Sequence, residues 1–203
     1  MAGLDKIEEY RGIRGLVAAK VLTDDSTTFE CDTPFAVAGV AELSRTTETS
    51  SEPHYYDNVP AIVINSTGSD EVTISASAIP FDVLAKITGQ IYDATTGMFV
   101  EGERTNDYYA IGYITKKVDG TEIFVWRLKG TFNIPDSTHV TENDGTDANG
   151  QEIVFTGINT THKFTKTKKT AKAINVDTSV NKNVTEETFF AEVQTPDTVT
   201  AAA

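Results

Sequence analysis

Three histidines are the side chains best suited to acid–base chemistry, because imidazole has the ordinary pKa closest to neutral pH. His54, His139 and His162 stand far apart in the sequence, each within a polar segment. A serine–histidine–aspartate site assembled by the fold stays open as an alternative, since such sites are defined by geometry and not by chain position. The polar surroundings favour surface positions, and we expect no catalytic residues and no enzymatic activity.

Motifs for nucleotide, acyl-transfer or zinc chemistry are missing from the sequence. It contains no GxGxxG or GxxxxGK[ST] loop, no GxSxG turn and no HExxH pair. The acidic segment 142–150 suggests calcium, but an EF-hand aligned on Gly150 needs an acid at Gly145 and a glutamate at Thr156. Both requirements fail, so we expect a hydrophilic loop there, with no metal and no cofactor.

The charge of the chain limits its partners. The 17 Lys and Arg residues against 30 Asp and Glu residues give a formal charge of −13. Binding to nucleic acid by phosphate neutralisation needs a basic surface, so this balance argues against it. The one basic cluster, at 163–172, would place Lys166, Lys168 and Lys172 on one face of an extended strand. A solvated linker is the alternative, but we favour charge partners for acidic groups of neighbouring copies.

Two aromatic pairs stand in otherwise polar segments. Tyr55 and Tyr56 precede Asp57-Asn58 near the end of the polar stretch 44–60, and Phe189 and Phe190 lie close to the C-terminus. Exposed aromatic side chains often mark protein interfaces, because they supply contact area at low entropic cost. Anchoring each segment on the protein's own core is an equally open alternative.

The elements that position these residues are mainly strands. The 31 threonines favour half-exposed pleated surfaces. Residues 71–78 alternate apolar and polar, a strand pattern, and Asp119-Gly120 between 108–118 and 121–129 predicts a two-residue hairpin turn. The second arm of this hairpin would place Phe124, Trp126 and Leu128 on one face and Ile123, Val125 and Arg127 on the other. Residues 80–88 predict a helix that starts at Pro80 and ends at Gly89, and the spacing of Phe81, Leu84, Ala85 and Thr88 predicts its buried face.

These elements predict a mainly antiparallel β fold, a sandwich or open barrel, with one flanking helix. We expect an N-terminal arm at 1–15, a core domain at 16–164 with a turn at 65–70, and a C-terminal strand and extended arm at 165–203. Residues 44–60 are expected as a long functional loop. The absence of a signal sequence, the lack of a membrane-spanning apolar run and the single Cys31 favour synthesis in the cytoplasm without membrane insertion.

Several short segments in a fixed order carry a family resemblance. They are 55–58 (YYDN) after the long loop, 108–113 (YYAIGY), 126–127 (WR), 190–193 (FAEV) and 195–197 (TPD). With the helix between them, they resemble the major tail tube proteins of bacteriophages with long, non-contractile tails, especially those of Gram-positive hosts. The resemblance covers roughly residues 10–200.

The resemblance implies a structural virion protein of the tail. Such subunits form hexameric rings that stack as a hollow tube around a tape-measure protein, with tail terminator and tail-tip proteins at the ends. The genome passes through the lumen, and an acidic lining would let DNA slide without specific binding. Tyr55, Tyr56, Asp57 and Asn58 would make inter-ring contacts, and Phe189 and Phe190 would make arm contacts. A β-sandwich module that binds carbohydrate or protein on a virion or cell surface is the alternative.

Overall fold

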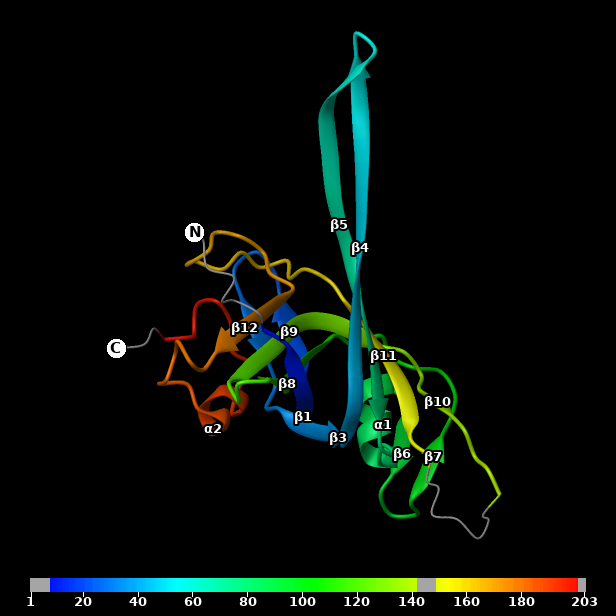
Figure 1. Cartoon of the computed structure of the whole chain (residues 1–203). Helices are drawn as coiled ribbons and strands as arrows, with labels where there is room; N and C mark the ends of the chain where they lie inside the picture. Colours follow the sequence, from blue (N-terminus) through cyan, green and yellow to red (C-terminus); the bar gives the residue numbers. More distant parts are fainter. Residues whose placement is uncertain (1–7, 142–148, 201–203) are drawn as a thin grey trace.

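The computed structural model describes residues 8–141 and 149–200 as a mainly β protein with two short helices (Figure 1). The helices are α1 (Phe81–Thr88) and α2 (Glu186–Phe190). The strands are β1 (Tyr10–Asp24), β2 (Phe29–Cys31), β3 (Phe35–Ala38), β4 (Val40–Tyr56), β5 (Val59–Ala76), β6 (Ile91–Asp93), β7 (Met98–Val100), β8 (Tyr109–Lys117), β9 (Glu122–Phe132), β10 (Asp136–Ser137), β11 (Gln151–Gly157) and β12 (Ala173–Asp177).

One large sheet dominates the described chain. Its strands run in the order β2-β1-β8-β9-β11-β5-β4, while β3, β12 and β10 pair beside β1, β9 and β11. All of these pairs are antiparallel, and the sheet does not close into a barrel. The prediction of a mainly antiparallel β fold is therefore confirmed. β1 begins at Tyr10, so part of the segment expected as an N-terminal arm belongs to the sheet.

The central strands β8 and β9 are buried on both faces. On one face, Tyr109 and Ile111 join a core with Ile74, Phe155 and the helix α1. On the other face, Phe124, Trp126 and Leu128 pack against the C-terminal segment. The predicted alternation along β9 is confirmed, since Ile123 and Val125 lie in a separate cluster on its opposite side. Burial on both faces explains why these strands are almost continuously apolar.

The helix α1 confirms the element expected at 80–88. Pro80 precedes it at the N-cap, and Gly89 closes it in the left-handed conformation with φ 69°. A left-handed backbone favours glycine because a Cβ atom is strained there. One side chain of the expected buried face differs: Phe81 is exposed and stacks on Phe99, with ring centroids 5.4 Å apart.

The hairpin between β8 and β9 is confirmed, but its turn is not the predicted one. Lys117 N–H donates to the carbonyl of Thr121, which closes a loop of three residues instead of two. Gly120 has φ 94°, whereas Asp119 does not adopt a positive φ. A three-residue loop with glycine in the left-handed position needs only one such residue, so Asp119 keeps an ordinary conformation.

The expected long loop at 44–60 is wrong, because these residues belong to a β-hairpin. β4 and β5 pair from Val40↔Ala76 to Tyr56↔Val59, and the expected turn at 65–70 is also wrong, since β5 runs through it. In Figure 1 this ribbon stands out from the body of the molecule. Its outer part exposes both faces to water, so it lacks the apolar–polar alternation that identifies a strand packed on a core.

The C-terminal segment lies against the sheet in the described structure. β12 pairs with β9, and α2 follows as a second helix that the sequence did not predict. Thr185 caps α2 by accepting from the backbone N–H of Thr188. Phe189, in the last turn of α2, packs in the core cluster around Trp126, so residues up to 200 cover one face of the sheet. No helix among the described residues is long and apolar enough to cross a membrane.

Candidate assembly surfaces

The hairpin β4–β5 is the most prominent candidate for contact with other molecules. From Thr49 to Tyr56 its pairs run along eight positions, which at roughly 3.3 Å per residue extends about 26 Å. The loop at its end consists of Asp57 and Asn58, with φ 50° and 64°. Two successive residues with positive φ are the signature of a type I′ turn, whose twist matches that of the flanking strands.

The distal half of the hairpin carries exposed apolar side chains on both faces. Residues that pair across two strands share a face, so Tyr56, Val59, Ile62 and Ile64 lie on one side and Tyr55, Pro60 and Val63 on the other. All of these Tyr, Val and Ile side chains are more than half exposed. The proximal pairs are polar, namely Thr49↔Thr67, Ser50↔Ser66 and Ser51↔Asn65. A two-stranded ribbon with water on both sides is marginal by itself, so the distal half has the properties of a contact surface.

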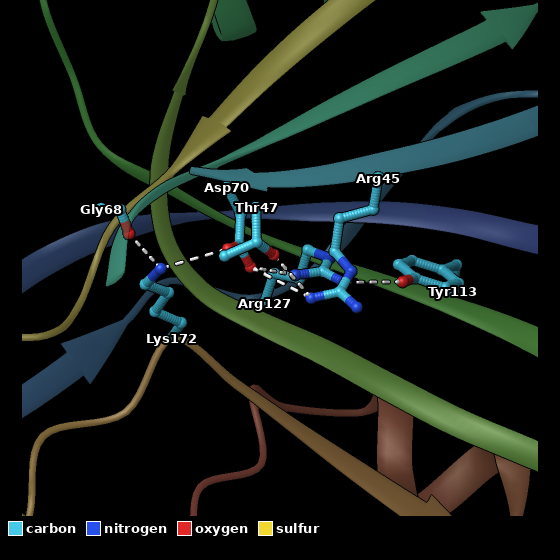
Figure 2. A network of polar contacts seen from close by, with 7 residues as sticks. All are labelled: Arg45, Thr47, Gly68, Asp70, Tyr113, Arg127 and Lys172. Atoms are coloured by element: carbon cyan, nitrogen blue, oxygen red, sulfur yellow. Dashed lines mark hydrogen bonds and ion pairs between the residues drawn. The ribbon is translucent and has the colours of Figure 1, made fainter. Parts of the chain in front are cut away.

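A buried ionic network holds the root of the hairpin, and Figure 2 shows it from close by. Asp70 of β5 is 3% exposed and accepts from Arg127 Nη1 of β9 at 2.9 Å. Lys172, from the C-terminal segment, donates to Asp70 Oδ1 at 3.1 Å and also to the carbonyl of Gly68. Arg45 of β4 lies 3.8 Å from Asp70 Oδ2. One carboxylate therefore joins the hairpin, the central sheet and the C-terminal segment.

The electrostatics of the root follow from this arrangement. Burial alone raises the pKa of Asp70, but hydrogen bonds from Lys172 and Thr47 and the charges of Lys172 and Arg127 outweigh it, so the pKa lies below its ordinary value. Arg127 also donates to the Tyr113 hydroxyl at 3.4 Å. The carboxylate thus stays ionised at neutral pH, and the root remains clamped.

The sequence pattern missed this network. Arg127 was placed on one face of a strand with Ile123 and Val125, and a charged residue on an apolar face is a signal for a buried partner. Nothing in the sequence identified that partner, because Asp70 stands 57 positions away in a segment expected as a turn. A second buried pair, Lys129 with Asp24 at 2.6 Å, was missed for the same reason.

The predicted charge partners lie in different settings. Residues 164–169 form a tight turn closed by a bridge between Phe164 and Lys169, so Lys166 and Lys168 do not share a strand. Lys166 donates to the carbonyl of Val199 at 2.8 Å, and Lys172 belongs to the root network. Lys168 has a positive φ of 54° and an exposed side chain. Contact of these lysines with a neighbouring copy stays a prediction.

Both phenylalanines of the pair at 189–190 pack within the protein. Phe189 is 1% exposed, with its ring centroid 5.4 Å from that of Phe124. Phe190 packs 5.5 Å from Trp126, whose indole N–H donates to the carbonyl of Phe189 at 3.0 Å. This placement agrees with the alternative in which the pair anchors its segment on the protein's own core.

The three histidines lie on separate elements. His54 stands on the hairpin, His139 lines a cavity of about 530 Å³ beside Phe81, and His162 packs edge-on against Phe164. Within 8–141 and 149–200 no three His, Cys, Asp or Glu side chains form a group that could hold a metal ion. The acidic segment considered for calcium falls mostly on 142–148, outside the described residues.

Comparison with known proteins gives one match that covers most of the chain. The model of a family described as phage tail tube protein matches residues 34–198. No curated protein sequence matches the chain. The matched range contains the whole hairpin, its root network and α2.

Proposed function

The chain belongs to the phage tail tube protein family, and we propose that its hairpin β4–β5 makes the contacts that join stacked rings of a hollow tube. Proteins of this family are structural components of the virion tail and associate with themselves. The proposal adds the finer arrangement: hexameric rings, their stacking, and passage of the genome through the lumen.

The exposed distal half of the hairpin is the observation that carries this proposal. Val59, Ile62, Val63 and Ile64 form an almost continuous apolar run without cover in the protomer. A soluble protein gains nothing from holding such a run away from its own core. Contact with a neighbouring copy would cover it and would stabilise the ribbon at the same time.

The proposal also includes the finer features that the family resemblance implies. A heterologous contact that closes by rotation gives a ring, and an axial one continues as a filament. The charge of −13 supports a lumen along which DNA passes without being held. Tape-measure, terminator and tail-tip proteins, and a long non-contractile tail, are expected from the same resemblance.

The alternative of a carbohydrate- or protein-binding module finds less support. Such a site gathers aromatic side chains on one concave surface. The exposed aromatic residues of the described chain lie on different elements, with Tyr55 and Tyr56 at the hairpin tip, Phe81 on α1, Tyr10 on β1 and Tyr108 just before β8. This dispersion favours assembly over capture of a small ligand.

Shortening the hairpin tests the proposal. Deleting 44–60 alone would leave β5 without its partner strand, so the better variant replaces residues 50–66 by Asn-Gly. Thr49 and Thr67 are direct partners, and a two-residue turn can join them. We expect a folded monomer with a retained near-UV circular dichroism spectrum and no tubes in negative-stain electron microscopy.

A pair of point variants supplies the matched control. Val63→Asp places a charge on the distal hairpin, whereas Val180→Asp places one on an exposed valine far from it in sequence. We expect tubes from Val180→Asp and not from Val63→Asp. Tubes of normal length from the shortened hairpin would show that another segment joins the rings.

A further inference from the structure

A second two-stranded element presents an uncovered apolar face. β6 and β7 pair as Ile91↔Val100, Tyr92↔Phe99 and Asp93↔Met98. Because pairs alternate between faces, Ile91, Met98 and Val100 share the outer one with Asp93. Their side chains are 66%, 54% and 39% exposed. The inner face packs on the body, since Phe99 stacks on Phe81 and borders the core cluster of α1.

The turn of this element is held by its own polar groups. Asp93 accepts from the backbone N–H of Thr95 at 2.9 Å and from the Thr96 hydroxyl at 2.7 Å. Gly97 follows with φ 70°, and its N–H donates to the carbonyl of Asp93. The hydrogen-bonded turn and the packing of Phe99 on the body therefore hold the outer face in a fixed position.

The β6–β7 face lies at the end of the molecule opposite the hairpin tip. Figure 1 shows the turn between β4 and β5 at one extreme and β6, β7 and α1 toward the other. A contact between surfaces at opposite ends of identical copies is heterologous, so each copy uses both surfaces once. Such a contact repeats along a line of copies, which is the geometry that a tube requires along its axis.

Both surfaces are low in charge on a strongly acidic protein. Residues 52–64 contain two acids, Glu52 opposite Ile64 and Asp57 in the turn, and residues 91–100 contain one, Asp93, whose carboxylate is engaged in its own turn. Copies that each carry −13 repel one another, and two surfaces with few acids can meet at the smallest cost. Apolar area on both sides then supplies the attraction.

We propose that the outer face of β6–β7, formed by Ile91, Met98 and Val100, receives the distal hairpin of a second copy. The proposal rests on the proposed function of the hairpin and adds the surface that it contacts. The partner is another molecule of this chain, and the contact is apolar, made by the side chains of residues 55–64.

Cross-linking between two differently labelled copies tests the pairing. In a Cys31→Ala background, protein with Tyr56→Cys is mixed with protein with Met98→Cys, assembled, and treated with a bismaleimide whose spacer tolerates differences in register. We expect a cross-linked dimer from the mixture, above the background of either variant alone. The control mixture pairs Tyr56→Cys with Val180→Cys. A dimer from the control and none from the test mixture would overturn the proposal.

Charge insertion separates this inference from the role of the hairpin itself. Met98→Asp and Val63→Asp should each raise the critical concentration for assembly by about tenfold or more, because both bury an acid in the same contact. If Val63→Asp blocks assembly and Met98→Asp does not, the hairpin joins copies but another surface receives it. If neither variant affects assembly, both proposals fail. Retained near-UV circular dichroism shows that each variant is folded.

Discussion

Replacing Asp70 by asparagine perturbs the root of the hairpin without changing its size. The substitution removes one negative charge from a site where Arg127 and Lys172 donate at 2.9 and 3.1 Å. Asp70 and Arg127 are only 3% and 6% exposed, so little water reaches this site. Water would therefore not compensate the charges of Arg127 and Lys172 once the carboxylate is lost. The variant therefore leaves positive charge uncompensated where three separate segments meet.

The expected loss follows from the burial of each partner. Breaking a buried ion pair by removing one member costs about 3–5 kcal/mol. Arg45 is half exposed and lies 3.8 Å away, so its share stays below about 1 kcal/mol. We expect the free energy of unfolding to fall by about 3–5 kcal/mol for Asp70→Asn. At about 2–4 °C per kcal/mol for a chain of this size, the Tm falls by about 6–20 °C.

Urea unfolding followed by the fluorescence of Trp126 measures this change. Trp126 is the single tryptophan and is fully buried, so its emission reports on the core. All proteins carry Val63→Asp, because assembly would add its own stabilisation. Glu186→Gln is the matched control: it breaks an exposed pair with Arg14 and should cost less than about 1 kcal/mol.

The pH dependence of the difference gives a second check. The folded pKa of Asp70 lies below that of the unfolded chain, so its stabilisation is present above about pH 4 and is lost as the pH falls through the folded pKa. The difference in the free energy of unfolding between the parent protein and Asp70→Asn should be constant from neutral pH to about pH 5 and should become smaller below about pH 4.

Two results would refute this reasoning. One is a loss under about 1 kcal/mol at pH 7, which would show that the network does not clamp the root. The other is a difference in the free energy of unfolding between the two proteins that stays unchanged below pH 4. The double variant Asp70→Asn/Arg127→Met sharpens the test: removing the buried cation as well should recover part of the lost stability, because a buried pair replaced on both sides is often neutral.

Three further predictions concern the C-terminal segment, the thiol and the charge. Phe189→Ala should lower the free energy of unfolding by about 3–5 kcal/mol in urea titrations, since it empties a site packed against Phe124 and beside Trp126; a loss under about 1 kcal/mol would contradict this packing. Burial raises the pKa of the Cys31 thiol to about 12, so its reaction with a disulfide reagent at pH 8 should be slow in the folded protein and fast in urea. Added salt should lower the critical concentration for assembly, because copies of charge −13 repel; a rise would contradict this and would indicate that ion pairs between copies, for which Lys166, Lys168 and Lys172 are the candidates, outweigh the repulsion.

Local patterns determined the elements whose signals are contained within a few residues. The helix at 80–88 was predicted with its Pro80 start and Gly89 end, because caps are set by the conformations of single residues. The period of two along 71–78 and 121–129 assigned their side chains to the correct faces, since successive side chains of a strand point to opposite sides of the sheet. The family resemblance, carried by short segments in order, was confirmed by the match over 34–198.

The hairpin β4–β5 shows why other elements were missed. The distal parts of both strands contact water on both faces. Because neither face packs on a core, these segments need no alternation of apolar and polar residues. Asp57-Asn58 was the local signal, because asparagine and aspartate tolerate the positive φ that a type I′ turn needs. Tyr56 and Val59 flank this turn as direct partners, which a search for hairpin turns could have found.

The sequence by itself determined that this protein is acidic, strand-rich and without the motifs of an enzyme, and it placed aromatic and apolar residues at 55–64. Only the tertiary structure decided that this segment stands clear of the body, that Phe189 belongs to the core, and that Asp70 meets Arg127 and Lys172. The physical reason is the range of the interactions. Turns and caps depend on neighbouring residues, whereas burial and ion pairing depend on which distant segments the sheet brings together.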